Sequence, residues 1–236
     1  MLSLKNITLK VGQRLLFNSD NIELKEGLIA LIGRNGAGKS SLFQSLLQSF
    51  PLSNGEFLVN GQELNRLKKA DLAKTIAIVF TKPEVYGDNR VEDIMVLGRI
   101  PHQGFMGKTT TDDLAIVRKI TQQLNISQFL NRSFSSLSDG EKQLVMIGRA
   151  FVQDTPIILL DEPAAFLDVV NRIELIKILK ELAESENKLI IFSTHHLDQI
   201  EENCDGVLLI ADSKLRFLEN KADFLPSIQT AFNLEQ

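Results

Sequence analysis

A glycine-rich stretch followed by a lysine and a serine carries the clearest chemistry in this sequence. Residues 33–40 read Gly-Arg-Asn-Gly-Ala-Gly-Lys-Ser and fit the pattern G-x-x-x-x-G-K-S, with Gly33, Gly38, Lys39 and Ser40 at the fixed places. Glycines let the backbone curl until its N–H groups converge, and such a concavity binds phosphate oxygens. The lysine adds a cation, and the serine hydroxyl is a ligand for Mg²⁺. The candidate residues for binding the phosphates of a nucleotide are Gly33, Arg34, Asn35, Gly36, Ala37, Gly38, Lys39, Ser40 and Ser41.

Two carboxylates follow an apolar run later in the chain. Residues 157–160 read Ile-Ile-Leu-Leu, and Asp161 and Glu162 come directly after them. In open sheets of parallel strands, ligands bind at the carboxyl ends of the strands, so both acids are expected at such a crevice. Asp161 is placed to hold Mg²⁺ together with Ser40, and Glu162 is placed to polarise an attacking water as the catalytic base.

A third motif points to a family. Residues 137–143 read Leu-Ser-Asp-Gly-Glu-Lys-Gln and resemble the signature of ABC ATPases, whose usual form is L-S-G-G-Q. Ser138 and Gly140 match that form, and they would offer a hydroxyl and backbone N–H groups at the start of a predicted helix, which is a second anion site. The resemblance implies a head-to-tail homodimer in which each ATP contacts the glycine-rich loop of one copy and Ser138 and Gly140 of the other.

Other residues extend the resemblance, and two depart from it. Residues 165–168 look like the loop that follows the acidic strand in this family, and His195 looks like its switch histidine, which would contact the γ-phosphate and orient the water or Glu162. A glutamine usually stands where this chain has Thr81, and an aromatic that stacks on adenine usually stands near Val11. Our hypothesis is that Phe17 reaches the adenine base instead.

A segment near the middle of the chain narrows the resemblance. Gly98, Arg99, Pro101 and His102 match a pattern typical of the ATPases of importers for iron-siderophores, haem and vitamin B12. Residues 151–156 and 203–205 also look like that group. The resemblance implies transmembrane permease subunits as partners, with the loop 98–107 docking a permease helix. It also implies an indirect periplasmic or lipoprotein binding protein, and a place on the cytoplasmic face of the inner membrane.

The elements that must position these residues alternate between buried strands and helices. This alternation predicts an α/β fold with a parallel sheet, and the resemblance specifies a P-loop NTPase with a RecA-like core, an N-terminal antiparallel β subdomain and an inserted helical subdomain. We expect one domain over 1–236, with a catalytic core at 1–81 and 156–236 and a helical lobe at 82–155. Strands are expected at 2–11, 28–32, 56–59, 75–80, 157–160, 189–193 and 207–210, and helices at 40–50, 91–97, 112–124, 141–152 and 171–185.

Composition excludes several classes of protein. The 236 residues carry a net charge of −4, which is not the basic balance of a general nucleic-acid binder. The single cysteine, Cys204, excludes an intramolecular disulfide and is interpreted as a small buried hydrophobe. Apolar runs reach only four or five residues, where a membrane span needs about 20, and the N-terminus lacks the apolar region of a signal peptide.

The sequence therefore predicts an Mg²⁺-dependent ATPase subunit of an ABC importer for a metal chelate. Two alternatives stay open. One is a soluble ABC ATPase acting on nucleic acid or ribosomes, which the single cassette and the acidic balance disfavour. The other is a degenerate regulatory nucleotide binder, suggested by Thr81 and Val11.

Overall fold

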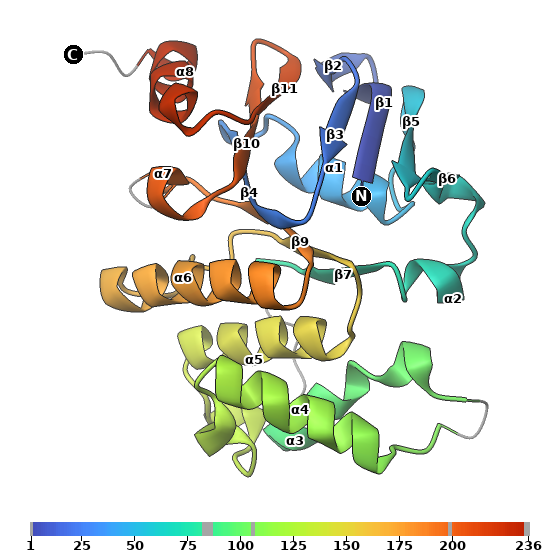
Figure 1. Cartoon of the computed structure of the whole chain (residues 1–236), viewed down its shortest axis with the longest axis vertical. Helices are drawn as coiled ribbons and strands as arrows, with labels where there is room; N and C mark the ends of the chain where they lie inside the picture. Colours follow the sequence, from blue (N-terminus) through green and yellow to red (C-terminus); the bar gives the residue numbers. More distant parts are fainter. Residues whose placement is uncertain (1, 82–86, 105–106, 198–199, 234–236) are drawn as a thin grey trace.

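The computed structural model describes residues 2–81, 87–104, 107–197 and 200–233. One large sheet runs through it in the order β6-β5-β1-β2-β11-β10-β4-β9-β8-β7, with β3 paired to β1 (Figure 1). The strands are β1 Leu2–Val11, β2 Arg14–Asn18, β3 Ile22–Leu24, β4 Gly27–Gly33, β5 Asn54–Val59, β6 Gln62–Glu63, β7 Ile76–Val79, β8 Ile157–Leu160, β9 Leu189–Ser193, β10 Gly206–Ala211 and β11 Lys214–Leu218. The α-helices are α1 Lys39–Leu46, α2 Lys69–Leu72, α3 Val91–Leu97, α4 Thr111–Gln123, α5 Asp139–Val152, α6 Val169–Ser185, α7 Ile200–Asn203 and α8 Phe224–Phe232.

Five neighbouring strands of the sheet are parallel. β10, β4, β9, β8 and β7 pair in that order with matching direction. Their residues are mostly apolar and almost wholly buried, because both faces of these strands are covered. Helices from later in the chain cover one face, and α1 with the antiparallel strands covers the other. The carboxyl ends of parallel strands all lie on the same side of the sheet. The residues that follow β4, β8 and β9 are therefore brought together there. The predicted α/β fold with a parallel core is confirmed.

The N-terminal strands form an antiparallel part of the same sheet. β1 pairs antiparallel with β2, β3 and β5, and β10 pairs antiparallel with β11. A single parallel register pair, between Lys214 and Asn18, joins this part to the parallel strands through β11 and β2. The predicted N-terminal antiparallel region is confirmed.

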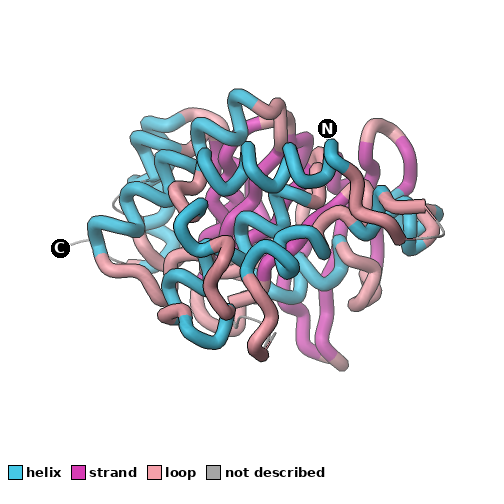
Figure 2. Tube along the Cα trace, turned by 90° about the horizontal axis from the view of Figure 1, so that it is seen from below, coloured by secondary structure: helices cyan, strands magenta, loops and turns pink. Residues whose placement is uncertain are grey.

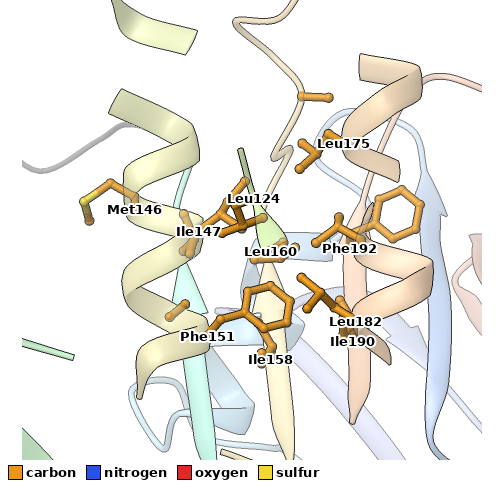
Figure 3. Close-up of a cluster of buried hydrophobic side chains, with 14 of the residues drawn as sticks. Leu124, Met146, Ile147, Phe151, Ile158, Leu160, Leu175, Leu182, Ile190 and Phe192 are labelled. Atoms are coloured by element: carbon orange, nitrogen blue, oxygen red, sulfur yellow. The ribbon is translucent and has the colours of Figure 1, made fainter. Parts of the chain in front are cut away.

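Three helices of the middle segment lie together at one end of the molecule. α3, α4 and α5 pack against one another, and the tube view shows helices covering the sheet on the side from which it is seen (Figures 1 and 2). α5 also packs on β7 and β8, and its side chains meet those of β8, β9 and α6 in a buried apolar cluster (Figure 3). This contact holds the helical segment against β8, the strand that Asp161 follows.

Several element ends differ from the sequence-based predictions. The helix predicted over 40–50 ends at Leu46, because Gln48 adopts a left-handed φ of 56° and its side-chain amide donates to the Leu64 carbonyl oxygen at 2.6 Å. Pro51, a residue type that commonly follows the end of a helix, therefore does not end this one. α5 and α6 each begin two residues before their predicted starts, at the residues after their N-caps Ser138 and Asp168. The predicted start of the helical lobe, at residue 82, lies outside the described residues.

Candidate functional site

The glycine-rich loop follows β4 and leads into α1, as the pattern predicts. Gly36 and Gly38 have φ values of 74° and 110°, which side chains with a Cβ rarely adopt. A Cβ at Gly38 would also lie 3.0 Å from the ring of Phe17 and 3.2 Å from Leu16. Both the conformation and the close packing therefore require glycine at position 38, and they fix the backbone N–H groups of the loop.

Lys39 lies within the curl of this loop. Its side-chain amine donates to the carbonyl oxygen of Gly33 at 2.8 Å, and the residue is 7% exposed. Burial lowers the pKa of Lys39 from its ordinary value, against the opposing influence of the Glu162 and Asp161 carboxylates. A bound anion would restore the stabilisation that burial removes from the ammonium group, so the loop favours a phosphate.

Ser40 of α1, Asp161 after β8 and Ser193 at the end of β9 form a hydrogen-bonded chain. The Ser40 hydroxyl donates to Oδ2 of Asp161 at 2.8 Å, and the Ser193 hydroxyl donates to Oδ1 at 2.7 Å. Hydroxyl and carboxylate oxygens are the hard donors that Mg²⁺ prefers, so this pair fits the ion. Among the described residues no group of three or more histidines, cysteines or acids could hold a metal. The remaining oxygens would therefore come from phosphates and water, as is usual for Mg²⁺.

Glu162 and His195 meet next to this chain. Nε2 of His195 lies 2.6 Å from Oε1 of Glu162, and the backbone N–H of Glu162 donates to the Ser193 hydroxyl at 2.8 Å. Glu162 has a φ of 50°, a left-handed conformation that is strained for this residue type and common at functional sites. The bond to Ser193 helps to hold this conformation, and the structure brings together both residues predicted to be catalytic.

The signature residues lie at the start of α5, apart from this network. Ser138 is the N-cap: its hydroxyl accepts from the N–H of Glu141 at 3.3 Å, and its own N–H donates to the Glu141 carboxylate at 2.7 Å. That backbone N–H lowers the pKa of Glu141. A Cβ on Gly140 would lie 2.9 Å from Leu167 and 3.2 Å from the Phe166 carbonyl oxygen.

A cavity of about 580 Å³ lies beside Ser138 and Gly140. The described residues that line it come from the helical segment and from 166–178, and none belongs to 33–41. Within one chain the structure therefore does not bring the signature residues to the glycine-rich loop.

The comparisons with known proteins agree with this geometry. A family model described as "ABC transporter" matches residues 17–165. The chain belongs to the ABC transporter family. It is 30% identical to a petrobactin import ATP-binding protein of Bacillus anthracis over 92% of this chain and 80% of that protein. It is 33% identical to a cobalamin import ATP-binding protein of Halobacterium salinarum over 86% of this chain and 51% of that protein.

A solved structure of similar shape belongs to the same family. One chain of a metal-chelate type ABC transporter in an inward-facing conformation superimposes with a TM-score of 0.84 and 28% identity, covering 98% of this chain and 88% of that one. The fold is thus that of an ABC ATPase, and the cassette described here is an ATPase. No helix among its described residues has the length and apolar character that a membrane span requires.

Thr81 and Val11, the two residues that depart from the family pattern, differ in what they contact in this ABC cassette. The Thr81 hydroxyl donates to the carbonyl oxygen of Asp161 at 3.1 Å, so it supports the acidic strand end through the backbone. Val11 is 50% exposed and has no aromatic ring to stack on a base. The hypothesis that Phe17 reaches the base is wrong: Phe17 is fully buried, and its ring packs under Gly38 of the loop.

The residues of the importer-like motif make contacts inside the cassette. Arg99 is 7% exposed, pairs with Asp113 at 2.8 Å and donates to the Val152 carbonyl oxygen at 2.8 Å. Nε2 of His102 lies 2.7 Å from the carbonyl oxygen of Gln153. These contacts fasten the segment after α3 to the end of α5, and they leave Leu97 and Ile100 exposed at 40% and 57%.

Two residues that contribute to the site, Ser193 and Phe232, were not predicted from the sequence. Ser193 stands at the end of a buried strand beside the Asp161 strand, and that position was a usable signal. Arg34 contacts Phe232 at the end of α8, and no local pattern indicated that pairing.

Proposed function

We propose that this cassette is the ATP-hydrolysing subunit of an ABC importer that drives uptake of a metal chelate through a partner permease. The observation that carries the enzymatic part is the hydrogen-bonded network from Ser40 through Asp161 and Ser193 to Glu162 and His195. Support for import comes from relatives named as import ATP-binding proteins for petrobactin and cobalamin. Whether the cargo is an iron-siderophore, haem or cobalamin is decided by other subunits.

In the proposed site, the loop 33–41 binds the phosphates of ATP. Its backbone N–H groups and the N-terminal end of α1 would face the phosphate oxygens, and Lys39 would add a cation to the β- and γ-phosphates. Ser40 and Asp161 would hold Mg²⁺, which neutralises charge on the phosphates when bound. Arg34, Asn35, Gly36, Ala37 and Ser41 contribute mainly through the loop backbone.

Hydrolysis transfers the γ-phosphoryl group to water. The water oxygen bonds to phosphorus while the bond from phosphorus to the bridging oxygen of ADP breaks, and Glu162 accepts a proton from the water. His195, 2.6 Å from the Glu162 carboxylate, is positioned to orient that carboxylate and to contact the γ-phosphate. The role of the protein is mainly positioning and charge stabilisation.

A second copy would complete the site. Because the signature residues of one chain line a cavity separate from its own loop 33–41, we infer that Ser138 and Gly140 contact the γ-phosphate held by the other copy in a head-to-tail homodimer. A dimer that closes only with ATP has an open and a closed state, and the difference in ATP affinity between these states sets their populations. The permease would change its conformation together with the opening and closing of the dimer.

Support for membrane partners comes from the relatives rather than from the site. We propose a catalytic core at 1–81 and 156–236 and a helical lobe at 82–155 that docks a permease helix. The exposed apolar side chains of Leu97 and Ile100 support this docking surface. The cassette would then be held peripherally on the cytoplasmic face of the inner membrane, with a periplasmic or lipoprotein binding protein as an indirect partner.

Two measurements with Glu162→Gln test the proposal. The variant should keep ATP binding, slow hydrolysis by about 10²–10⁴-fold as expected for loss of a general base, and trap an ATP-bound dimer. Unchanged turnover would remove Glu162 from the role of base. A pull-down of the same variant from membranes of its own host, with ATP present, should recover a many-spanning permease. Recovery from the soluble fraction with ribosomal or nucleic-acid partners would reject the importer.

A further inference from the structure

The side chain of Arg34 leaves the phosphate-binding loop and contacts the C-terminal helix. Its Nη2 donates to the carbonyl oxygen of Phe232 at 2.9 Å, and its guanidinium carbon lies 5.7 Å from the centre of the Phe232 ring. The two residues are 198 positions apart in the chain. One arginine thus makes both a charge-assisted hydrogen bond and a cation–π contact with the last residue of α8.

The end of α8 is built to receive this arginine. Asn233 adopts a left-handed φ of 54° and ends the helix, so the Phe232 carbonyl lacks a partner within the helix. A helix C-terminus carries partial negative charge, which favours a cation at this place. Phe224 and Ile228 are fully buried and anchor the helix in the core beside β10. The arginine therefore binds to a fixed support.

The backbone of Arg34 continues the connection into the loop. Its carbonyl oxygen accepts from the N–H of Ala37 at 3.1 Å and lies 3.5 Å from the Lys39 amine. Arg34 and Phe232 also line two cavities, of about 290 and 270 Å³. The second cavity includes His195. The loop would be free to move into these spaces if Arg34 were released.

We propose that Phe232 is a positioning residue for ATP binding, which holds Arg34 and thereby preforms the bend of the phosphate-binding loop. The proposal rests on the ATP site proposed above. A preorganised loop loses less conformational freedom when ATP binds. Removing the ring should therefore weaken ATP binding and leave the chemical step nearly unchanged.

The test uses the purified full chain and compares Phe232→Ala with Gln229→Ala, an exposed residue on the same helix. Phe232→Ala should raise KM for ATP roughly fivefold with kcat within about twofold, because a cation–π contact of ordinary strength is lost. Phe232→Tyr should restore the wild-type KM. A chain shortened after Ala231 should resemble Phe232→Ala or be weaker, whereas one shortened after Asn233 should match the wild type.

A double variant decides whether the effect passes through Arg34. In an Arg34→Ala background, Phe232→Ala should cause no further rise in KM. An equal effect in both backgrounds, a Phe232→Ala enzyme indistinguishable from Gln229→Ala, or a loss confined to kcat and thermal stability would each overturn the proposal. Dissociation constants for a fluorescent ATP analogue are measured in parallel. If the wild type binds the analogue without hydrolysing ATP, the proposed enzymatic function fails while the role of Phe232 is still tested.

Discussion

Ser193 offers the sharpest test of how the proposed catalytic network is held. Its hydroxyl is fully buried, donates to Oδ1 of Asp161 at 2.7 Å and accepts from the backbone N–H of Glu162 at 2.8 Å. Ser193→Ala removes both bonds with almost no change in shape. The carboxylate then loses a donor, and the N–H that supports the strained backbone of Glu162 loses its acceptor.

The size of the effect follows from these two bonds. A hydrogen bond to a charged group contributes about 1.5–3 kcal/mol, and a buried donor left unpaired adds to the loss, so we expect about 2–4 kcal/mol in total. If the whole loss appears in the free energy of unfolding, the melting temperature falls by about 5–15 °C for a chain of this size. If part of this free energy is lost instead because Glu162 is misplaced, kcat falls about tenfold for each 1.4 kcal/mol.

Ser45→Ala is the matched control for this experiment. Ser45 is 3% exposed in α1, and its hydroxyl has no hydrogen-bond partner among the described residues. Its removal breaks no hydrogen bond among these residues, so it should not lower the free energy of unfolding, and turnover should change by less than about 0.5 kcal/mol. Urea unfolding and steady-state hydrolysis are measured for both variants. The reasoning is refuted if Ser193→Ala differs from Ser45→Ala by less than that amount in both assays.

Two further predictions concern titratable groups away from the phosphates. The hydrogen bond from Arg99 is the main reason why the pKa of Asp113 in the folded protein lies below its ordinary value of 3.8. The ionised carboxylate therefore stabilises the fold above pH 3.8, and this stabilisation is lost as the pH falls through the pKa of the folded state. Asp113→Asn should cost roughly 1–3 kcal/mol in urea unfolding at pH 6, a difference from wild type that shrinks toward pH 3; a constant difference would contradict this assignment. Burial raises the pKa of Cys204 to about 12, so the native thiol should resist alkylation at pH 8 and react only after unfolding. Rapid labelling of the native protein would show that the thiol is accessible.

Local chemistry explains what could be predicted from the sequence. The conformation of residues 33–40 depends on glycines at Gly36 and Gly38, whose φ values other residues rarely adopt, so the motif alone predicts the loop. The strand Ile157–Leu160 is apolar throughout and ends at Asp161, which places the acids at the crevice once the strands are parallel. The seven predicted strands lie close to observed strands, whereas β2, β3, β6 and β11 and the helices α2, α7 and α8 were not predicted.

The structure decided the features that depend on contacts between distant segments. α1 ends at Leu46 because Gln48 finds an acceptor in the Leu64 carbonyl, which no helix-ending signal announces. Phe17 packs beneath Gly38 and not against a base, because its strand turns that side chain into the core.

The sequence by itself determined which residues can bind phosphate, hold Mg²⁺ and accept a proton, because those abilities belong to single side chains and short backbone patterns. Tertiary structure alone decided that Ser193 joins Asp161 to Glu162 and that Arg34 ends on Phe232. Each of these pairings joins residues 31 to 198 positions apart. Their physical cause is the register of parallel strands and the packing of α8, which exist only after the whole sheet has formed.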